Sequence, residues 1–243
     1  PLVSSSAASD VYKRQTLTGT NSYTIVISDN DSIGSTASEL NAINEATSLP
    51  VDASAVTELA LDEIININAL LTAGNDLTKF SEESFSILQK VDLGDTTLTV
   101  SELNELVDLA NILTAETSAL TTFSLSDGAT INTGDETEFR TLLTNVENDQ
   151  VTITNQNLIV DSGTLSVATA NDLDAITEGT ITADIAIDST VDSLATLTGT
   201  NELTIVINEL DTSVEASDLT AIDDATSVAI NADAVVEITG TYS

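Results

Sequence analysis

The sequence predicts an α/β repeat protein, built as a solenoid-like stack of parallel strands with short helices along one side. Three observations carry this prediction. Part of the chain occurs twice, each copy switches between strand-like and helix-like hydrophobic periodicity, and aromatic side chains make up only 3% of the 243 residues. A core of Leu, Ile, Val and Ala suits thin, closely stacked layers. The alternative is an irregular β-helix in which the short helices are only turns.

The repeated stretch has two parts. Residues 17–30 read LTGTNSYTIVISDN and match residues 197–210, LTGTNELTIVINEL, at nine of 14 positions. Residues 37–59 read ASELNAINEATSLPVDASAVTEL and match residues 216–238, ASDLTAIDDATSVAINADAVVEI, at 12 of 23 positions. Two copies about 180 residues apart indicate duplication of a supersecondary unit.

Each copy has the pattern of strand, short helix, strand. In the second copy, apolar residues recur at every second position over 203–207 and again over 228–234, which is strand periodicity. Between them, apolar residues three apart over 216–225 form the narrow stripe of a short helix. We expect Ser38 and Ser217 to cap these helices. Such a unit cannot bury its apolar face alone and requires stacked neighbours.

The rest of the chain follows the same alternation with more drift. Helical periodicity predicts helices over residues 63–74, 81–90, 101–113, 135–147, 169–178 and 190–197. Alternating patterns predict strands over residues 96–100, 121–133, 150–167 and 180–187. Because no linker-like composition follows residue 15, we expect residues 16–243 to form a single continuous repeat body.

The shared periodicity also predicts burial. Apolar positions that recur in both copies belong to the face that each unit must cover, whereas acidic positions between them face solvent. We expect the following side chains inside: Leu40, Ile43, Leu219, Ile222, Ile205, Ile207, Ile25 and Ile27. We expect the following outside: Glu39, Asp218 and Asp223.

The two ends of the chain suggest a fragment. Residues 1–15, PLVSSSAASDVYKRQ, resemble the translated sequencing-adapter sequence found at the ends of open reading frames from metagenome assemblies. We expect them to be an artefactual, disordered tail, the alternative being a genuine disordered arm. The chain opens with Pro1 and stops in mid-pattern at Ser243, which favours a piece of a longer protein.

The charge of the chain and the residue types that it lacks exclude several classes of function. The chain carries 40 acidic and five basic residues, a net charge of −35, which argues against binding nucleic acid or anionic membranes. It contains neither cysteine nor histidine, so disulfides, thiolate nucleophiles, imidazole bases and ordinary zinc sites are excluded. No apolar run is long enough to insert into a membrane.

Carboxylates are the abundant reactive groups. A catalytic pair of the kind used in glycoside hydrolysis needs a cleft, usually with aromatic platforms, and this chain has few aromatics, so we expect no enzymatic activity. Calcium is the more credible ligand, because hard oxygen atoms in turns suit it. The alternative is that these aspartates cap and bend the backbone. The candidate calcium ligands are Asp29, Asp31, Asp92, Asp95 and Asp161.

The motifs LTGTN-x-x-TIVI, ASDLTAIDDATS and VDASAVTEL resemble repeats of very large secreted or cell-surface proteins of marine bacteria and cyanobacteria. Those proteins are often grouped with hemolysin-type or adhesin-like chains. The likeness is good over residues 17–61 and 165–241 and loose between them. It implies an extracellular or cell-surface location, a structural or adhesive role, and neighbouring repeats of the same chain as partners. The GGxGxD calcium nonapeptides common in such proteins are absent.

The function expected from these features is a structural or adhesive repeat segment of a large extracellular bacterial protein. Cell-surface or matrix carbohydrate is the external partner that this role implies. One alternative is a calcium-stabilised repeat region of a toxin-like protein exported by type I secretion. Another is a β-helical carbohydrate-active enzyme.

Overall fold

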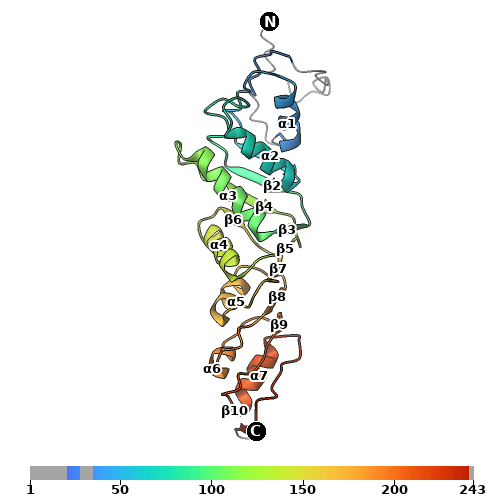
Figure 1. Cartoon of the computed structure of the whole chain (residues 1–243), viewed down its shortest axis with the longest axis vertical. Coiled ribbons are helices and arrows are strands. Elements are labelled where there is room, and N and C mark those ends of the chain that lie inside the picture. Colours follow the sequence, from blue (N-terminus) through green and yellow to red (C-terminus); the bar gives the residue numbers. More distant parts are fainter. Residues whose placement is uncertain (1–20, 28–34, 241–243) are drawn as a thin grey trace. The chain divides into compact units, whose positions relative to one another are not determined.

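The computed structural model describes residues 21–27 and 35–240 (Figure 1). The tail at residues 1–15 and the candidate ligands Asp29 and Asp31 lie outside the described residues. Within them, the fold is α/β, with parallel strands, short helices and no closed barrel. The α/β prediction with parallel strands is therefore confirmed.

The described residues form two compact units that interleave along the sequence. The first contains the described residues up to Asp95 together with Glu102–Ser126 and Asn145–Thr152. The second contains Thr96–Ser101, Asp127–Thr144 and the described residues from Ile153 onward. The expectation of one continuous body over residues 16–243 stays a prediction.

The first unit contains a four-stranded parallel sheet in the order β1-β2-β4-β6. Leu59, Val91, Phe123 and Val151 lie in register on these strands and are all buried. An apolar residue at the same point of each strand builds a continuous core ladder. The strands are β1 (Glu58–Asp62), β2 (Lys90–Leu93), β4 (Thr122–Leu125) and β6 (Val151–Thr152). The helices are α1 (Ala37–Glu45), α2 (Ile64–Gly74) and, from Glu102 on, α3 (Val100–Thr114).

The second unit contains a five-stranded parallel sheet in the order β3-β5-β7-β8-β9 and a parallel pair, β10-β11. Its buried ladder consists of Leu98, Ile131, Leu158 and Ile181. The strands are β3 (Thr97–Thr99), β5 (Thr130–Asn132), β7 (Asn157–Ile159), β8 (Ile181–Asp184), β9 (Glu202–Thr204), β10 (Ser213–Glu215) and β11 (Glu237–Thr239). The helices are α4 (Glu136–Glu147), to Thr144, α5 (Val167–Asp174), α6 (Val191–Leu194) and α7 (Ala216–Asp224).

The duplicated sequence folds in the same way in both copies. Helices α1 and α7 occupy matching positions in the two copies and have nine residues each. The parallel pairs of the first copy are Asn21 with Thr47, Val26 with Asp52, and Ser35 with Leu59. The pairs at the matching positions of the second copy are Asn201 with Thr226, Val206 with Asn231, and Val214 with Ile238. The duplication is thus one of strand pairing as well as of sequence.

The helix predicted over residues 81–90 is wrong. Residues 82–87 form turns, Phe85 has a φ of 61°, and Lys90 begins β2. Tertiary packing overrides the local pattern, because Phe80 and Phe85 are fully buried with ring centroids 5.1 Å apart in an edge-on arrangement. The other predicted helices are present with shifted bounds.

The predicted helix caps are also wrong. Thr36, not Ser38, caps α1, with Glu39 completing a capping box. At α7 the capping position is Glu215, which makes no side-chain cap hydrogen bond, so Ser217 does not have the predicted role.

The burial prediction holds best where a segment has neighbours on both sides. Leu40, Ile205, Ile207 and Ile222 are buried. The others of the set are half-buried: Ile25, Ile27, Ile43 and Leu219. Glu39 and Asp223 are exposed as predicted, whereas Asp218 is half-buried. Ile25 and Ile27 belong to the first described segment, which has a described neighbour on one side only.

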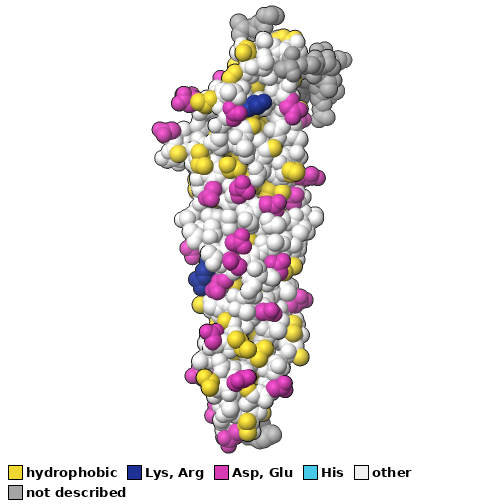
Figure 2. Space-filling model, viewed as in Figure 1, with side chains coloured by type: hydrophobic (Ala, Val, Ile, Leu, Met, Phe, Trp, Pro, Cys, Tyr) yellow, Lys and Arg dark blue, Asp and Glu magenta, His cyan; other side chains and the backbone are white. Residues whose placement is uncertain are grey.

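The surface reflects the acidic composition. Figure 2 shows acidic side chains spread over the face in view, with few basic ones. None of the helices in the described ranges is both long enough and apolar enough to span a bilayer.

Candidate functional site: carboxylates that join neighbouring segments

Each of the three described calcium candidates is engaged with the protein itself. Asp92 forms an ion pair with Lys90, with 2.7 Å between Oδ2 and Nζ. Asp95 accepts a hydrogen bond from the backbone N–H of Ile64 at 2.6 Å. Asp161 accepts one from the N–H of Gly134 at 3.2 Å. Over residues 21–27 and 35–240, no three acidic side chains are grouped so that they could hold a metal ion.

Two of these candidates belong to a recurring arrangement of four residues. Asp62 accepts a hydrogen bond from the N–H of Ser38 at 2.7 Å, and Asp211 accepts one from the N–H of Val191 at 3.1 Å. Each donor lies within two residues of the start of a helix, and each acceptor comes from a segment 20 to 31 residues later. We call these four residues the capping aspartates: Asp62, Asp95, Asp161 and Asp211.

A capping aspartate stabilises the start of a helix and links two segments of the chain. Asp62, Asp95 and Asp211 accept a first-turn backbone N–H that has no partner inside the helix, and Asp161 accepts the N–H of Gly134, two residues before α4. Each carboxylate also places a negative charge near the positive end of the helix dipole. Because the carboxylate belongs to a later segment, the same bond also fixes the spacing between two segments. The α1, α2, α4 and α6 helices are therefore each joined at the N-terminal end to a segment further along the chain.

Asp62 is the capping aspartate with the most hydrogen-bond donors. In addition to Ser38, the N–H of Glu63 and the side-chain amide of Asn66 each donate to its Oδ1 at 2.8 Å. Burial by itself raises the pKa of Asp62, but these hydrogen bonds outweigh that effect and hold the pKa below its ordinary value. Asp62 is therefore ionised at neutral pH and contributes most as the carboxylate.

The sequence reveals only part of this arrangement. Asp95 and Asp161 stand out in the sequence because they lie in turns, and in the structure both accept a backbone N–H from an earlier segment. Asp62 and Asp211 were missed. Asp62 directly precedes a predicted helix, so local reasoning assigns it to that helix, whereas its shortest bond reaches back to Ser38.

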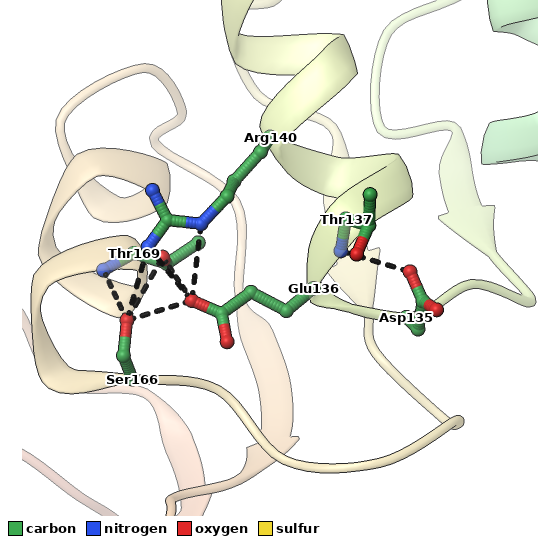
Figure 3. A network of polar contacts seen from close by, with 6 residues as sticks. All are labelled: Asp135, Glu136, Thr137, Arg140, Ser166 and Thr169. Carbon is green, nitrogen blue, oxygen red and sulfur yellow. Dashed lines mark hydrogen bonds and ion pairs between the residues drawn. The ribbon is translucent and has the colours of Figure 1, made fainter.

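A second carboxylate, Glu136, joins two helices of the second unit (Figure 3). It lies in the first turn of α4, and its Oε1 accepts hydrogen bonds from Ser166 at 2.7 Å and Thr169 at 2.5 Å. Arg140, one helical turn later, donates to the same oxygen at 2.9 Å and to Ser166 at 3.3 Å. Ser166 caps α5 by accepting from the N–H of Thr169. The start of α4 is thus bound to the start of α5.

The surroundings of Glu136 favour its charged form. Burial raises its pKa, but the hydrogen bonds from Thr169, Ser166 and Arg140, together with the Arg140 charge, outweigh burial and lower the pKa to about 2. The hydroxyl groups act as donors to the carboxylate, and Ser166 in turn accepts from the backbone. The network therefore has a structural role, which is to hold the start of α4 against the start of α5.

Replacing Glu136 with glutamine should destabilise the protein by about 1–2 kcal/mol at pH 7, less than the full pKa shift implies because the ion pair is partly open to solvent. The folded pKa, about 2, lies below the ordinary value of 4.5. The contribution is therefore present above pH ~4.5 and is lost as the pH falls towards ~2. The measurement is urea unfolding of both proteins across this range.

The matched control for Glu136→Gln is Glu147→Gln. Glu147 is exposed at the C-terminal end of the same helix, where a negative charge opposes the dipole. The Glu147→Gln substitution removes the same charge and should leave the free energy of unfolding unchanged or slightly raised. Equal destabilisation by both substitutions would contradict the role of the network.

The second unit also has an acidic hollow of about 420 Å³. It is lined by residues at the start of α6, on β10 and at the start of α7, together with Asp211 and Thr239, and four of its lining residues are acidic. One of the four, Asp211, already accepts the N–H of Val191 at the start of α6. The acidic lining residues are Asp192, Asp211, Glu215 and Asp218.

No family model, no curated protein and no solved structure matches this chain.

Proposed function

We propose that this chain is a structural and adhesive repeat segment of a large extracellular or cell-surface bacterial protein, with its strands and helices stacked as a solenoid-like array. The observation that carries the proposal is the recurrence of the capping aspartates. The same polar bond, from a later segment to an earlier helix, appears at four places in a chain whose strands pair in parallel.

An array of this kind suits a spacer. Its segments contact mainly their neighbours, so its stability is a sum of segment and interface terms, and its length grows with each added segment. Side chains also link neighbouring helices directly: the Asn41 amide on α1 donates to the Asn66 carbonyl on α2 at 3.0 Å. The Asn171 amide on α5 donates to the carbonyl of Thr196, in the turn that follows α6, at 2.9 Å.

The composition and the family resemblance support the location. Folding without cysteine is compatible with export in which no disulfide forms, and a net charge of −35 is best tolerated in a salty medium that screens repulsion. The external partner proposed for the adhesive role is cell-surface or matrix carbohydrate. The neighbouring repeats of the same chain are the internal partners.

The array is tested by replacing Asp95 with alanine and following amide hydrogen exchange over the whole chain. Losing the cap of α2 should cost about 1 kcal/mol. In an array, protection should fall in α2 and in the adjoining strands β1 and β2, while the second copy of the repeat, residues 197–239, keeps its protection. Uniform loss of protection in both copies would contradict the array.

Asp92→Ala provides the control. Asp92 lies three residues before Asp95, carries the same charge and forms its ion pair with Lys90, whose side chain is 48% exposed. Removing it should change stability by less than about 0.5 kcal/mol and leave exchange in α2 unchanged.

A further inference from the structure

Two apolar side chains at β11, one within the strand and one directly before it, are exposed. Val236 is 84% exposed and Ile238 is 62% exposed. Among the described residues, no strand pairs with this edge. An exposed, apolar strand edge is a template for pairing with another strand.

The first copy shows what covers the same edge. Ile238 aligns with Leu59, which is only 1% exposed. Leu59 pairs with Ser35 on one side, as Ile238 pairs with Val214, and it pairs with Val91 of β2 on the other. At this edge, the first copy therefore has a neighbouring strand, β2, that the second copy lacks among the described residues.

Polar groups, as well as apolar ones, define how β2 pairs with β1. The carbonyl of Thr57, which aligns with that of Val236, accepts the N–H groups of Gln89 at 2.8 Å and Lys90 at 3.2 Å. Lys90 lies in register with Glu58, which is conserved between the copies as Glu237. A segment that pairs here would therefore bring a cation opposite a glutamate.

The segment that leads into β2, residues 79–89, makes a second set of contacts with the first copy. Val51 donates its N–H to the carbonyl of Lys79 and accepts from the N–H of Ser81, both at 2.9 Å. Val51 is fully buried, whereas the aligned Ile230 is half-buried. Two strand contacts are thus used in the first copy and, among the described residues, are open in the second.

We infer that the outer edge of β11, together with Ile230, is a docking surface for one more parallel segment of this repeat type. Its occupant has the chemistry of residues 79–93: an apolar residue in register with Ile238, a Lys or Arg in register with Glu237, and a second strand contact at Ile230. This inference rests on the proposed function, because it treats the chain as an array that accepts further segments.

The test is to extend the chain with a second copy of residues 61–126, joined directly to Thr239 in place of residues 240–243. Amide exchange over residues 228–239 should slow at least tenfold, and the melting temperature should rise. The control carries the same graft with the substitutions Val91→Asp and Leu93→Asp within it, and should give neither effect. Unchanged exchange at residues 228–239 in a chain whose graft is itself protected would overturn the inference.

A substitution in the host strand separates docking from independent folding of the graft. Ile238→Asp should leave the melting temperature of the ungrafted chain nearly unchanged, because the side chain is exposed there. In the grafted chain it should abolish the gain, since it would bury a charge against Val91. Equal effects in both backgrounds would contradict docking. If the graft experiment fails but Asp95→Ala reduces protection only around α2, the docking surface is rejected and the proposed array is retained.

Discussion

Replacing Gly179 with alanine should destabilise the fold by about 3 kcal/mol or more. A Cβ atom at this position would lie 2.2 Å from the carbonyl oxygen of Gln156 and 2.6 Å from its carbonyl carbon. Both are backbone atoms of the preceding segment, so no side-chain rotation can relieve the overlap. The neighbouring bond from Glu178 N–H to Thr154 O, at 2.6 Å, holds the two segments together at this point. Urea unfolding at neutral pH measures the loss.

Gly128→Ala is the comparison for this substitution. Gly128 has a φ of +68° and nothing within 4 Å of an added Cβ. Its replacement should cost about 1 kcal/mol, through the left-handed backbone conformation alone. If both substitutions cost the same, close approach of segments at Gly179 is not what requires glycine.

Raising the sodium chloride concentration should stabilise the folded protein strongly. Repulsion within a chain of net charge −35 opposes the compact state, and the Debye length falls from about 30 Å at 0.01 M salt to about 3 Å at 1 M. A gain of about 2 kcal/mol would raise the melting temperature by roughly 4–8 °C. Thermal unfolding across a sodium titration measures it. A flat response would show that the acidic surface costs no stability.

Calcium at matched ionic strength distinguishes screening from binding. An ion that binds only the folded state stabilises it beyond the sodium control. Asp95 and Asp161 already accept backbone hydrogen bonds and Asp92 is paired with Lys90, so Asp92→Asn, Asp95→Asn and Asp161→Asn should leave any calcium increment unchanged. An increment that these substitutions remove would contradict the assignment of Asp95 and Asp161 as caps. One removed by Asp29→Asn with Asp31→Asn would place the site there.

Several features of the fold follow from the sequence alone. The duplication of residues 17–59 predicts two copies with the same helix and strand pairing, because identical apolar positions impose the same buried faces. Helices such as α3 and α4 have long, regular stripes, so their predicted positions are confirmed with only small shifts in their bounds. Aliphatic ladders such as Leu98 with Ile131 follow from period-two alternation.

Local patterns fail where a distant segment supplies the stabilising contact. Residues 81–90 have helical spacing, but burial of Phe85 and pairing of Lys90 with Glu58 and Thr122 favour turns and a strand. The contacts of Asp95 and Asp161 are another example, because each accepts a backbone N–H from a segment about 30 residues earlier, at or just before the start of a helix.

The sequence by itself determined the repeating strand–helix composition and the apolar faces, since periodicity is a property of consecutive residues. Tertiary structure decided which carboxylates join which helices. Asp62 and Ser38 lie 24 residues apart, and only the parallel pairing of segments brings the carboxylate to the helix N–H. A hydrogen bond requires a donor and an acceptor within about 3 Å, and chain spacing alone does not specify that distance.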